Sequence, residues 1–154
     1  MRLAGADAVN LLVGALQAKD LVYLTKIAKS VQMQSLLTVT SVSQLEKVVE
    51  AMDSGSVDGL IVSNRELEDF SFDMSGQRAL KILSSDAMKG FKSKYPDALI
   101  LVEGRVGIIQ DSTTSGEPSA EDYVRQLKDA GATGAIIGGG LAGEFAAALS
   151  SFAL

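Results

Sequence analysis

The chain contains no cysteine, no histidine and no tryptophan among its 154 residues. The absence of cysteine excludes disulfides, thiolate nucleophiles and cysteine-ligated metals. The absence of histidine removes the usual general base and the commonest zinc ligand. Any catalysis therefore depends on carboxylates, lysines, hydroxyl groups or backbone groups, and we expect neither a metal nor an organic cofactor.

Basic residues are also outnumbered, because 14 lysines and arginines stand against 19 acidic residues, which gives a net charge of −5 and a pI near 4.7. Non-specific binding to nucleic acid depends on a basic face, so we expect no nucleic-acid partner. The apolar runs are far shorter than the roughly 20 residues that span a bilayer. The first residues also lack the pattern of a signal peptide. We therefore expect a soluble intracellular protein without a membrane span.

A short apolar run, a turn and an amphipathic helix repeat along the chain. Runs of four to six residues that are apolar on both faces are typical of strands in a buried parallel sheet. The alternation of strands with helices predicts right-handed βαβ crossovers and an α/β fold. The predicted strands are Ala8–Val13, Leu36–Val39, Gly59–Val62, Ala98–Val102 and Gly134–Ile137, and the predicted helices are Ala18–Ser30, Ser43–Met52, Gly76–Lys94, Ala120–Ala130 and Leu141–Ser151.

Local signals mark helix ends and one interruption. Ser41 and Ser43 offer N-cap oxygens ahead of the second helix, and Gly131 ends the fourth. Residues 110–119 (QDSTTSGEPS) are polar and contain a proline and a glycine, so we predict a loop insertion after the fourth strand. Loops at the carboxyl ends of parallel strands form the functional face of such folds. This insertion is either a lid or a surface loop without function.

Glycines give the strongest local signal for a ligand. Gly138, Gly139 and Gly140 follow the last apolar run and open the final predicted helix. Backbone without side chains lets a phosphate approach the unpaired N–H groups of a helix N-terminus. Gly107, close after the preceding strand, lies where barrels place the other half of such a site. We therefore predict phosphate binding at these four glycines; the alternative is that the triplet only permits tight packing of strand and helix.

Polar residues follow three of the predicted strands. Residues 63–67 (SNREL) bring a hydroxyl, an amide and a guanidinium to the end of the third strand, where they either hold a polar ligand or cap a turn. Glu103 and Arg105 follow the fourth strand. They either take part in acid/base catalysis or form an ion pair in which the two charges cancel. Thr38 ends the second strand and offers a hydroxyl group without an ionisable proton.

Three blocks of this sequence resemble indole-3-glycerol-phosphate synthase. They are residues 4–9 (AGADAV), residues 63–70 (SNRELEDF) with Asp73, and residues 131–138, which include GA and AIIG. In the family the second block typically reads N-N-R-D-L-x-x-F-x-x-D. The resemblance spans nearly the whole chain but only the fourth to eighth strands of the family's barrel. It implies a TIM barrel, of which residues 1–154 form a single partial domain with five of the eight strands.

The resemblance also implies where reactive groups lie, and the chain departs from the family there. The family's catalytic glutamate on the fifth strand corresponds to Thr38. Its substrate-binding asparagine on the sixth strand corresponds to Ser63, and Asn64 corresponds to the next residue. Asn10 stands where the family usually has an apolar residue.

The last two strands depart as well. The family's E-S-G, which ends the seventh strand, falls on residues 105–107 without gaps, or on Glu103 and Gly104 after a two-residue insertion. Its G-x-S on the eighth strand falls on residues 138–140, which keep the backbone and lose the hydroxyl. Glu103 is therefore the candidate catalytic residue. The predicted remnants of a substrate pocket are Thr38, Ser63, Asn64 and Arg105.

The resemblance further implies that the family's catalytic lysine lies on the third strand, ahead of the matched part. Without that proton donor we expect no ring closure or decarboxylation by this chain alone. Five strands do not close an eight-stranded barrel, so the predicted sheet has open edges. Either a missing amino-terminal segment or a partner chain covers such an edge, or the chain has settled into an open sheet with helices on both faces.

We therefore expect a non-catalytic, synthase-like part of a barrel that binds a phosphorylated small molecule and acts through protein partners in a larger assembly. The alternatives are a fragment of an active synthase, which is a carbon–carbon lyase of tryptophan biosynthesis, and an unrelated α/β binding module. Residues 104–107 vary the family pattern in a way that suggests a plant or algal plastid, so we expect the plastid stroma or otherwise the cytoplasm.

Overall fold

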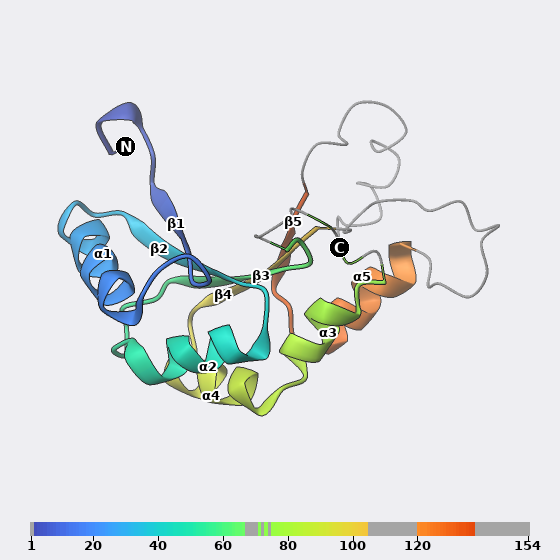
Figure 1. Ribbon diagram of the computed structural model, residues 1–154. Coiled ribbons are helices and arrows are strands. Elements are labelled where there is room, and N and C mark those ends of the chain that lie inside the picture. Colours follow the sequence, from blue (N-terminus) through green and yellow to red (C-terminus); the bar gives the residue numbers. More distant parts are fainter. Residues whose placement is uncertain (1, 67–70, 72, 74, 105–119, 138–154) are drawn as a thin grey trace.

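The computed structural model describes residues 2–66, 71, 73, 75–104 and 120–137, with the backbone alone for residues 120 and 121 (Figure 1). Strands and helices alternate through this part of the chain. After a 3-10 turn (η1, Arg2–Ala4), the strands are β1 (Ala8–Leu12), β2 (Gln34–Val39), β3 (Gly59–Ser63), β4 (Leu99–Glu103) and β5 (Gly134–Ile136). The helices are α1 (Ala18–Ser30), α2 (Val42–Ala51), α3 (Gln77–Leu83), α4 (Asp86–Lys94) and α5 (Ala120–Asp129).

The five strands form one parallel sheet in the order β1-β2-β3-β4-β5. Each strand therefore pairs with its neighbour in sequence, as in a (βα) barrel, whereas a doubly wound sheet reverses its strand order at a switch point. The helices lie along one side of the sheet (Figure 1). The predicted α/β fold is confirmed as parallel (βα) repeats in the arrangement of a partial TIM barrel. The described part is not an open sheet with helices on both faces.

The predicted elements agree closely with the observed ones, with one correction. The single helix predicted over 76–94 is wrong, because α3 ends at Leu83 and α4 begins at Asp86. Ser85 between them is extended, and its hydroxyl accepts a hydrogen bond from the Met88 N–H at 3.2 Å. A serine that caps a new helix competes with continuation of the old one. The predicted helix over 141–151 and the predicted loop over 110–119 lie outside the described residues.

The N-cap prediction for the second helix is resolved in favour of one serine. The Ser41 hydroxyl accepts a hydrogen bond from the Gln44 N–H at 3.3 Å, while Ser43 lies inside α2. Capping of this kind satisfies one of the four N–H groups that a helix start leaves unpaired.

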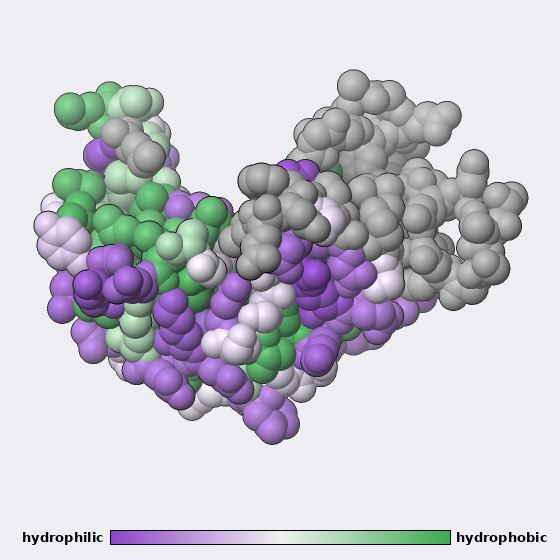
Figure 2. Space-filling model, in the orientation of Figure 1, coloured by the Kyte–Doolittle hydropathy of each residue, from purple (hydrophilic) through white to green (hydrophobic). Residues whose placement is uncertain are grey.

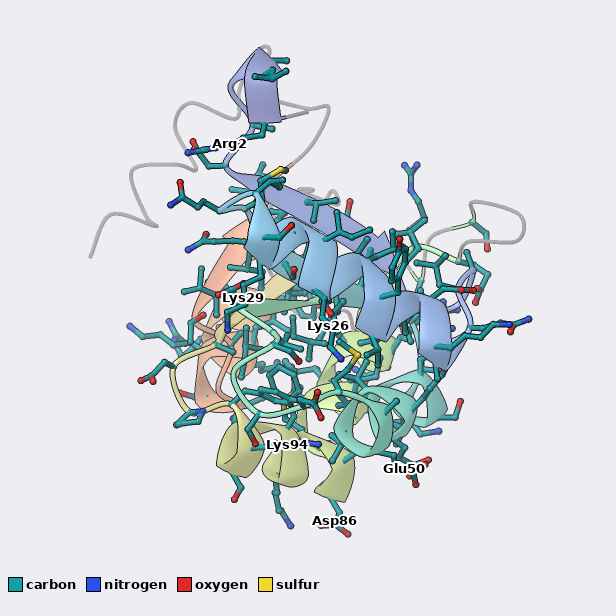
Figure 3. The ribbon with its side chains drawn as sticks, turned by 90° about the vertical axis from the view of Figure 1, so that its left-hand side faces the viewer. Arg2, Lys26, Lys29, Glu50, Asp86 and Lys94 are labelled. Atoms are coloured by element: carbon teal, nitrogen blue, oxygen red, sulfur yellow. The ribbon has the colours of Figure 1, made fainter. Side chains whose placement is uncertain are left out.

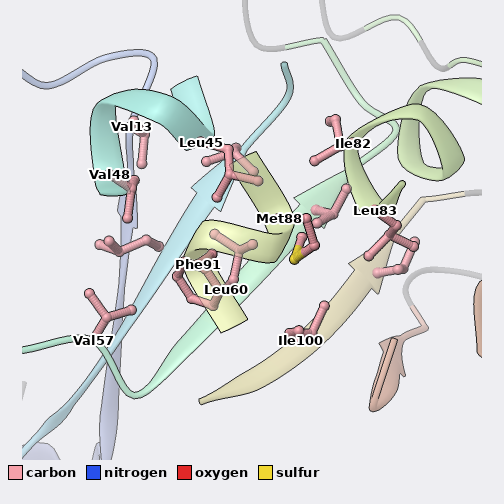
Figure 4. Packing of buried hydrophobic residues seen from close by; sticks show 14 of the residues in the cluster. Val13, Leu45, Val48, Val57, Leu60, Ile82, Leu83, Met88, Phe91 and Ile100 are labelled. Carbon is pink, nitrogen blue, oxygen red and sulfur yellow. The ribbon is translucent and has the colours of Figure 1, made fainter. Parts of the chain in front are cut away.

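The hydrophobic core lies between the sheet and the helices (Figure 4). Alternate residues of each strand point into it, such as Leu60 and Val62 on β3, both fully buried. From the helices, Leu45 and Phe91 pack against them. The ring centroids of Phe91 and Tyr95 are 4.9 Å apart in a tilted arrangement. One contiguous cluster thus connects β1–β4 with α1–α5.

The opposite face of the sheet carries the other set of alternating residues. Its middle is apolar, and Leu12 and Leu99 remain 36% and 49% exposed. Apolar side chains also gather over β1 and the amino-terminal turn (Figure 2). Towards the carboxyl ends of the strands this face becomes polar with Thr38, Ser63 and Glu103.

Charged side chains of the helices lie on their outer surfaces, as Lys26, Lys29, Glu50 and Asp86 show (Figure 3). Lys94 is half-buried, and its ammonium group donates to the Val49 carbonyl at 2.6 Å. Among the helices of the described residues, none combines the length and the apolar character needed to cross a membrane.

Candidate functional site at the carboxyl ends of the strands

Three of the residues predicted for the site share one face and one end of the sheet. Ser63 and Glu103 are register partners in the β3–β4 ladder. Thr38 is the partner of Ile61, two residues before Ser63. Because side chains alternate along a strand and match across a ladder, all three point away from the helices. The structure therefore brings Thr38, Ser63 and Glu103 together on the face that lines the interior of a barrel.

Thr38 is coupled to a residue on the neighbouring strand. It is 1% exposed, and its hydroxyl donates to the Asn10 Oδ1 atom at 2.7 Å. Both groups are neutral hydrogen-bonding groups, and neither is a base that takes up a proton at ordinary pH. The two residues thus form a hydroxyl–amide pair on the sheet face. The sequence drew attention to Asn10 only as a departure from the family pattern.

Ser63 fixes the first turn of the loop that follows β3. Its hydroxyl accepts a hydrogen bond from the Arg65 N–H at 3.1 Å and lies 3.5 Å from the Arg65 carbonyl oxygen, to which it donates. The Ser63 side chain is buried, with 1% of the residue exposed. Its hydroxyl therefore organises the backbone that presents Arg65 at the end of the sheet.

Glu103 places a carboxylate beside Ser63. The residue is half-buried, and its backbone carbonyl accepts from the Asn64 N–H at 2.9 Å. Its carboxylate forms no hydrogen bond or ion pair with another described residue. Among the described residues on this face, it is the group that could accept or release a proton.

Asn64 faces the helices, on the opposite side of the sheet from Thr38, Ser63 and Glu103. Its side-chain NH2 group donates to the Tyr123 hydroxyl at 2.9 Å and to the Gly104 carbonyl at 3.1 Å. Its Oδ1 atom accepts from the Ala79 N–H at 3.1 Å. The residue is fully buried. The structure therefore separates Asn64 from Thr38, Ser63 and Glu103.

The loop between β3 and α3 is held by a carboxylate at its end. Asp73 accepts hydrogen bonds from the Ser75 hydroxyl at 2.6 Å, the Ser75 N–H at 3.0 Å and the Arg78 N–H at 2.8 Å. Burial raises the pKa of Asp73, but these hydrogen bonds and the Arg78 charge outweigh it and lower the pKa below 3.8. Glu66 forms an ion pair with Arg78 at 2.9 Å. The loop is thus attached to the start of α3 at two points.

Two surface hollows of the described residues lie away from Thr38, Ser63 and Glu103. An apolar cavity of ≈ 380 Å³ lies between the amino-terminal turn, β1 and α1, where Val9, Ile27 and Val31 line it. A second, of ≈ 530 Å³, lies beside α3 and is lined by Arg78 and Lys81 among others. Neither is lined by Thr38, Ser63 or Glu103. Within the described residues, no group of three or more acidic side chains is arranged to hold a metal ion.

The predicted phosphate-binding residues lie outside the described part of the chain. They are Gly107, Gly138, Gly139 and Gly140, together with the predicted pocket residue Arg105. Their role stays a prediction from the sequence. The described part of the site is a polar strip at the carboxyl ends of β2, β3 and β4.

Sequence reasoning did not identify Tyr123 as part of this end of the molecule. Its residue type and its place in an amphipathic helix predict a core position, and it is 2% exposed. Only the packing of α5 against α3 brings its hydroxyl to Asn64, which lies 59 residues earlier in the chain. The sequence contains no local signal for that contact.

A parallel (βα) sheet with sequential strand order defines a protein of the barrel type, and the polar strip at its carboxyl ends is a candidate site on the face where barrels bind their ligands. The sequence model of indole-3-glycerol phosphate synthase matches residues 1–90. The chain belongs to this family.

Relatives with that name occur in several cyanobacteria. The one from Acaryochloris marina is 33% identical over 143 residues, which cover 93% of this chain and 41% of that protein. The one from Microcystis aeruginosa is 31% identical over 137 residues and is covered to 40%. A putative phosphonomutase from Burkholderia cenocepacia is structurally similar, with a TM-score of 0.49, 12% identity, and coverage of 87% of this chain and 60% of that one. The chain thus spans about two fifths of the length of these synthases.

Proposed function

We propose that this chain is a synthase-like part of a barrel that binds a phosphorylated small molecule at the carboxyl ends of its strands and does not by itself catalyse the family's reaction. The observation that carries this proposal is the hydrogen bond from Thr38 to Asn10 at 2.7 Å. The resemblance to the family places a catalytic glutamate at Thr38. A hydroxyl group bonded to an amide does not replace a carboxylate as a proton acceptor.

Binding of an anion is supported separately by the glycines of the sequence. Gly107 and the triplet 138–140 offer backbone N–H groups without side chains in the way. The polar strip of Ser63 and Glu103 lies at the ends of β3 and β4, which is the edge where barrels bind their ligands. The chain thus combines a sequence typical of anion binding with a neutral group at an acid/base position.

Binding of inorganic phosphate to the full chain tests this proposal. We expect chemical-shift changes in a ¹H–¹⁵N spectrum that saturate with phosphate concentration, and we expect Gly138→Asp to abolish them through charge repulsion. Gly55→Asp is the control, because Gly55 lies in the loop between α2 and β3 at the amino-terminal end of the sheet. Absence of saturable shifts in the parent protein contradicts the proposal, and unchanged binding in Gly138→Asp removes Gly138 from the site.

A second candidate function is that of an active synthase of which this chain is a part. The Glu103 carboxylate on the face of the sheet away from the helices favours it, because a base at this position lies next to Ser63 in the ladder. The reaction forms indole-3-glycerol phosphate from a carboxyphenylamino deoxyribulose phosphate. The gene from the source organism should then support growth of a tryptophan-requiring strain that lacks its synthase. Growth that is lost with Glu103→Gln and kept with Glu50→Gln identifies Glu103 as the base and contradicts the first proposal.

Partners are also part of the proposal. Within the described residues β1 pairs with β2 alone, and the apolar cavity beside it includes Ile27 and Val31, which are 41% and 43% exposed. Exposed apolar surface beside an unpaired strand edge is typical of an interface. We propose that a further (βα) unit, from a preceding segment or a partner chain, covers this edge. A location in the plastid or the cytoplasm stays a prediction.

A further inference from the structure

A buried polar cluster joins the two strand ends that carry Ser63 and Glu103. Asn64 follows Ser63 directly, and Gly104 follows Glu103. The Asn64 side-chain NH2 group donates to the Gly104 carbonyl at 3.1 Å and to the Tyr123 hydroxyl at 2.9 Å. The Tyr123 hydroxyl in turn donates to the Gly76 carbonyl at 3.2 Å. The cluster therefore connects the ends of β3 and β4 with the start of α3 and with α5.

Every other polar atom of Asn64 is also bound within the protein. Its Oδ1 atom accepts from the Ala79 N–H at 3.1 Å, and its carbonyl accepts from the Asp73 N–H at 2.8 Å. Its own N–H donates to the Glu103 carbonyl at 2.9 Å. A buried amide with all its partners in place has one orientation, because any rotation leaves polar atoms unpaired. Asn64 thus fixes the separation of the two strand ends.

Tyr123 completes this arrangement from a distance. It is 2% exposed and Asn64 is 0% exposed, so bulk water does not reach its hydroxyl in the folded protein. Removing the hydroxyl leaves one Asn64 N–H group and the Gly76 carbonyl without this partner. We expect Asn64 to rotate or the loop to open in response. Opening of the loop shifts Ser63 and Glu103, because the Asn64 N–H donates to the Glu103 carbonyl.

We infer that Tyr123 is a positioning residue for the candidate site, whose hydroxyl acts through Asn64 to hold the ends of β3 and β4 at a fixed spacing. This inference rests on the proposed function only for its effect on ligand binding. Its effect on the two strand ends stands on the geometry alone. Tyr123 acts through Asn64 and not by contact with the ligand.

A matched pair of tyrosine variants separates positioning from stability. Tyr95 is 4% exposed, and its hydroxyl donates to the Met52 carbonyl at 2.9 Å. It precedes β4 and thus lies at the amino-terminal end of the sheet. Tyr123→Phe and Tyr95→Phe each remove one buried hydroxyl and keep the ring. We expect them to lower the midpoint of urea unfolding by similar amounts.

The two variants should differ at the strand ends. In Tyr123→Phe, we expect hydrogen exchange of the Asn64 and Ala79 amides to accelerate roughly five- to tenfold more than exchange across the sheet, as loss of one buried hydrogen bond implies. We expect the dissociation constant for inorganic phosphate to rise by a similar factor of about five to ten. In Tyr95→Phe, the exchange rates of the Asn64 and Ala79 amides and the dissociation constant for phosphate should equal the parent values, once the exchange rates are corrected for the change in global unfolding free energy.

The outcomes distinguish this inference from the proposed function. Equal exchange at Asn64 and Ala79 in the two variants overturns the positioning role, whatever happens to phosphate. Local acceleration with unchanged phosphate affinity shows that the cluster holds the loops but does not set binding, which overturns the inference for the site. If the parent protein binds no phosphate, the proposed function fails, and the exchange measurement alone still decides whether Tyr123 fixes the strand ends.

Discussion

Single residues at the carboxyl end of the sheet are constrained by backbone conformation as well as by hydrogen bonds. Gly76, at the start of α3, has a φ of +69°, and a Cβ atom placed there would lie 2.5 Å from the Tyr123 ring. Gly55, in the loop before β3, has a similar φ of +73°, but a Cβ there meets nothing within 4 Å. The two glycines therefore share a conformational requirement and differ in their surroundings.

Gly76→Ala should destabilise the protein much more than Gly55→Ala. Both variants place an alanine in the left-handed backbone conformation, which costs about 1–2 kcal/mol. Only Gly76→Ala also forces the Tyr123 ring to move, which adds about 1–3 kcal/mol as in other overpacked cores. Urea unfolding of both variants measures the difference. Equal losses would show that α5 can shift without cost, and they would contradict the tight packing of Tyr123 on Gly76.

At the scale of elements, the break between α3 and α4 gives α3 a start and a direction of its own. Two helices of seven and nine residues replace one long helix, and each begins with its own cap. Asp73 supplies the acceptor for the start of α3, and the Ser85 hydroxyl supplies it for α4. Because α3 is separate from α4, it can direct the Ala79 N–H to Asn64 at the end of β3. The break thus helps to shape the candidate site.

The cap at Asp73 predicts a dependence of stability on pH. Hydrogen bonds to its carboxylate, set against the opposing effect of burial, lower its pKa below 3.8 in the folded protein. The charged carboxylate therefore stabilises the fold fully at pH values above the pKa that Asp73 has in the unfolded chain. This contribution disappears as the pH falls through the lower pKa that Asp73 has in the folded protein. Asp73→Asn should lower the unfolding free energy at pH 7, and the difference from the parent should shrink as the pH falls through the lowered pKa of the folded protein. A difference that is constant over this range would contradict the role of the charge.

For the whole molecule, one hydrophobic cluster determines whether it unfolds as a unit. Within the described residues the cluster includes side chains from β1 to β4 and from α1 to α5, so none of these elements has a core of its own. The two faces of the sheet differ, because helices cover one face and leave Leu12 and Leu99 partly exposed on the other. A single core of this kind favours a cooperative transition.

Phe91→Ala tests the unity of this core. Phe91, on α4, is 0% exposed and belongs to this cluster, so its truncation should cost about 3–5 kcal/mol. The transitions followed by far-UV circular dichroism and by tyrosine fluorescence should move together. Tyr23→Ala, on an exposed part of α1, should change stability by less than about 0.5 kcal/mol. Separate transitions for the two probes would mean that the (βα) repeats unfold independently.

Most of the fold could be predicted because each strand and helix carries its own pattern. Apolar runs bounded by turns gave all five described strands to within two residues, and α1 was predicted with its observed bounds. The break at Ser84 and Ser85 was missed, because apolar residues continue at helical spacing through it. For the site, the strand ends with Thr38, Ser63 and Glu103 were found, but the direction of Asn64 was not.

The sequence by itself determined the α/β class, the family and the polar residues at the strand ends, because these depend on neighbouring residues and on spacing along the chain. Only the tertiary structure decided that the strands follow in sequential order, that Thr38 is bonded to Asn10, and that Asn64 is held by Tyr123. The last two contacts join residues 28 and 59 positions apart. Such contacts form only when separate elements pack together, and no local pattern in the chain encodes which hydroxyl meets which amide.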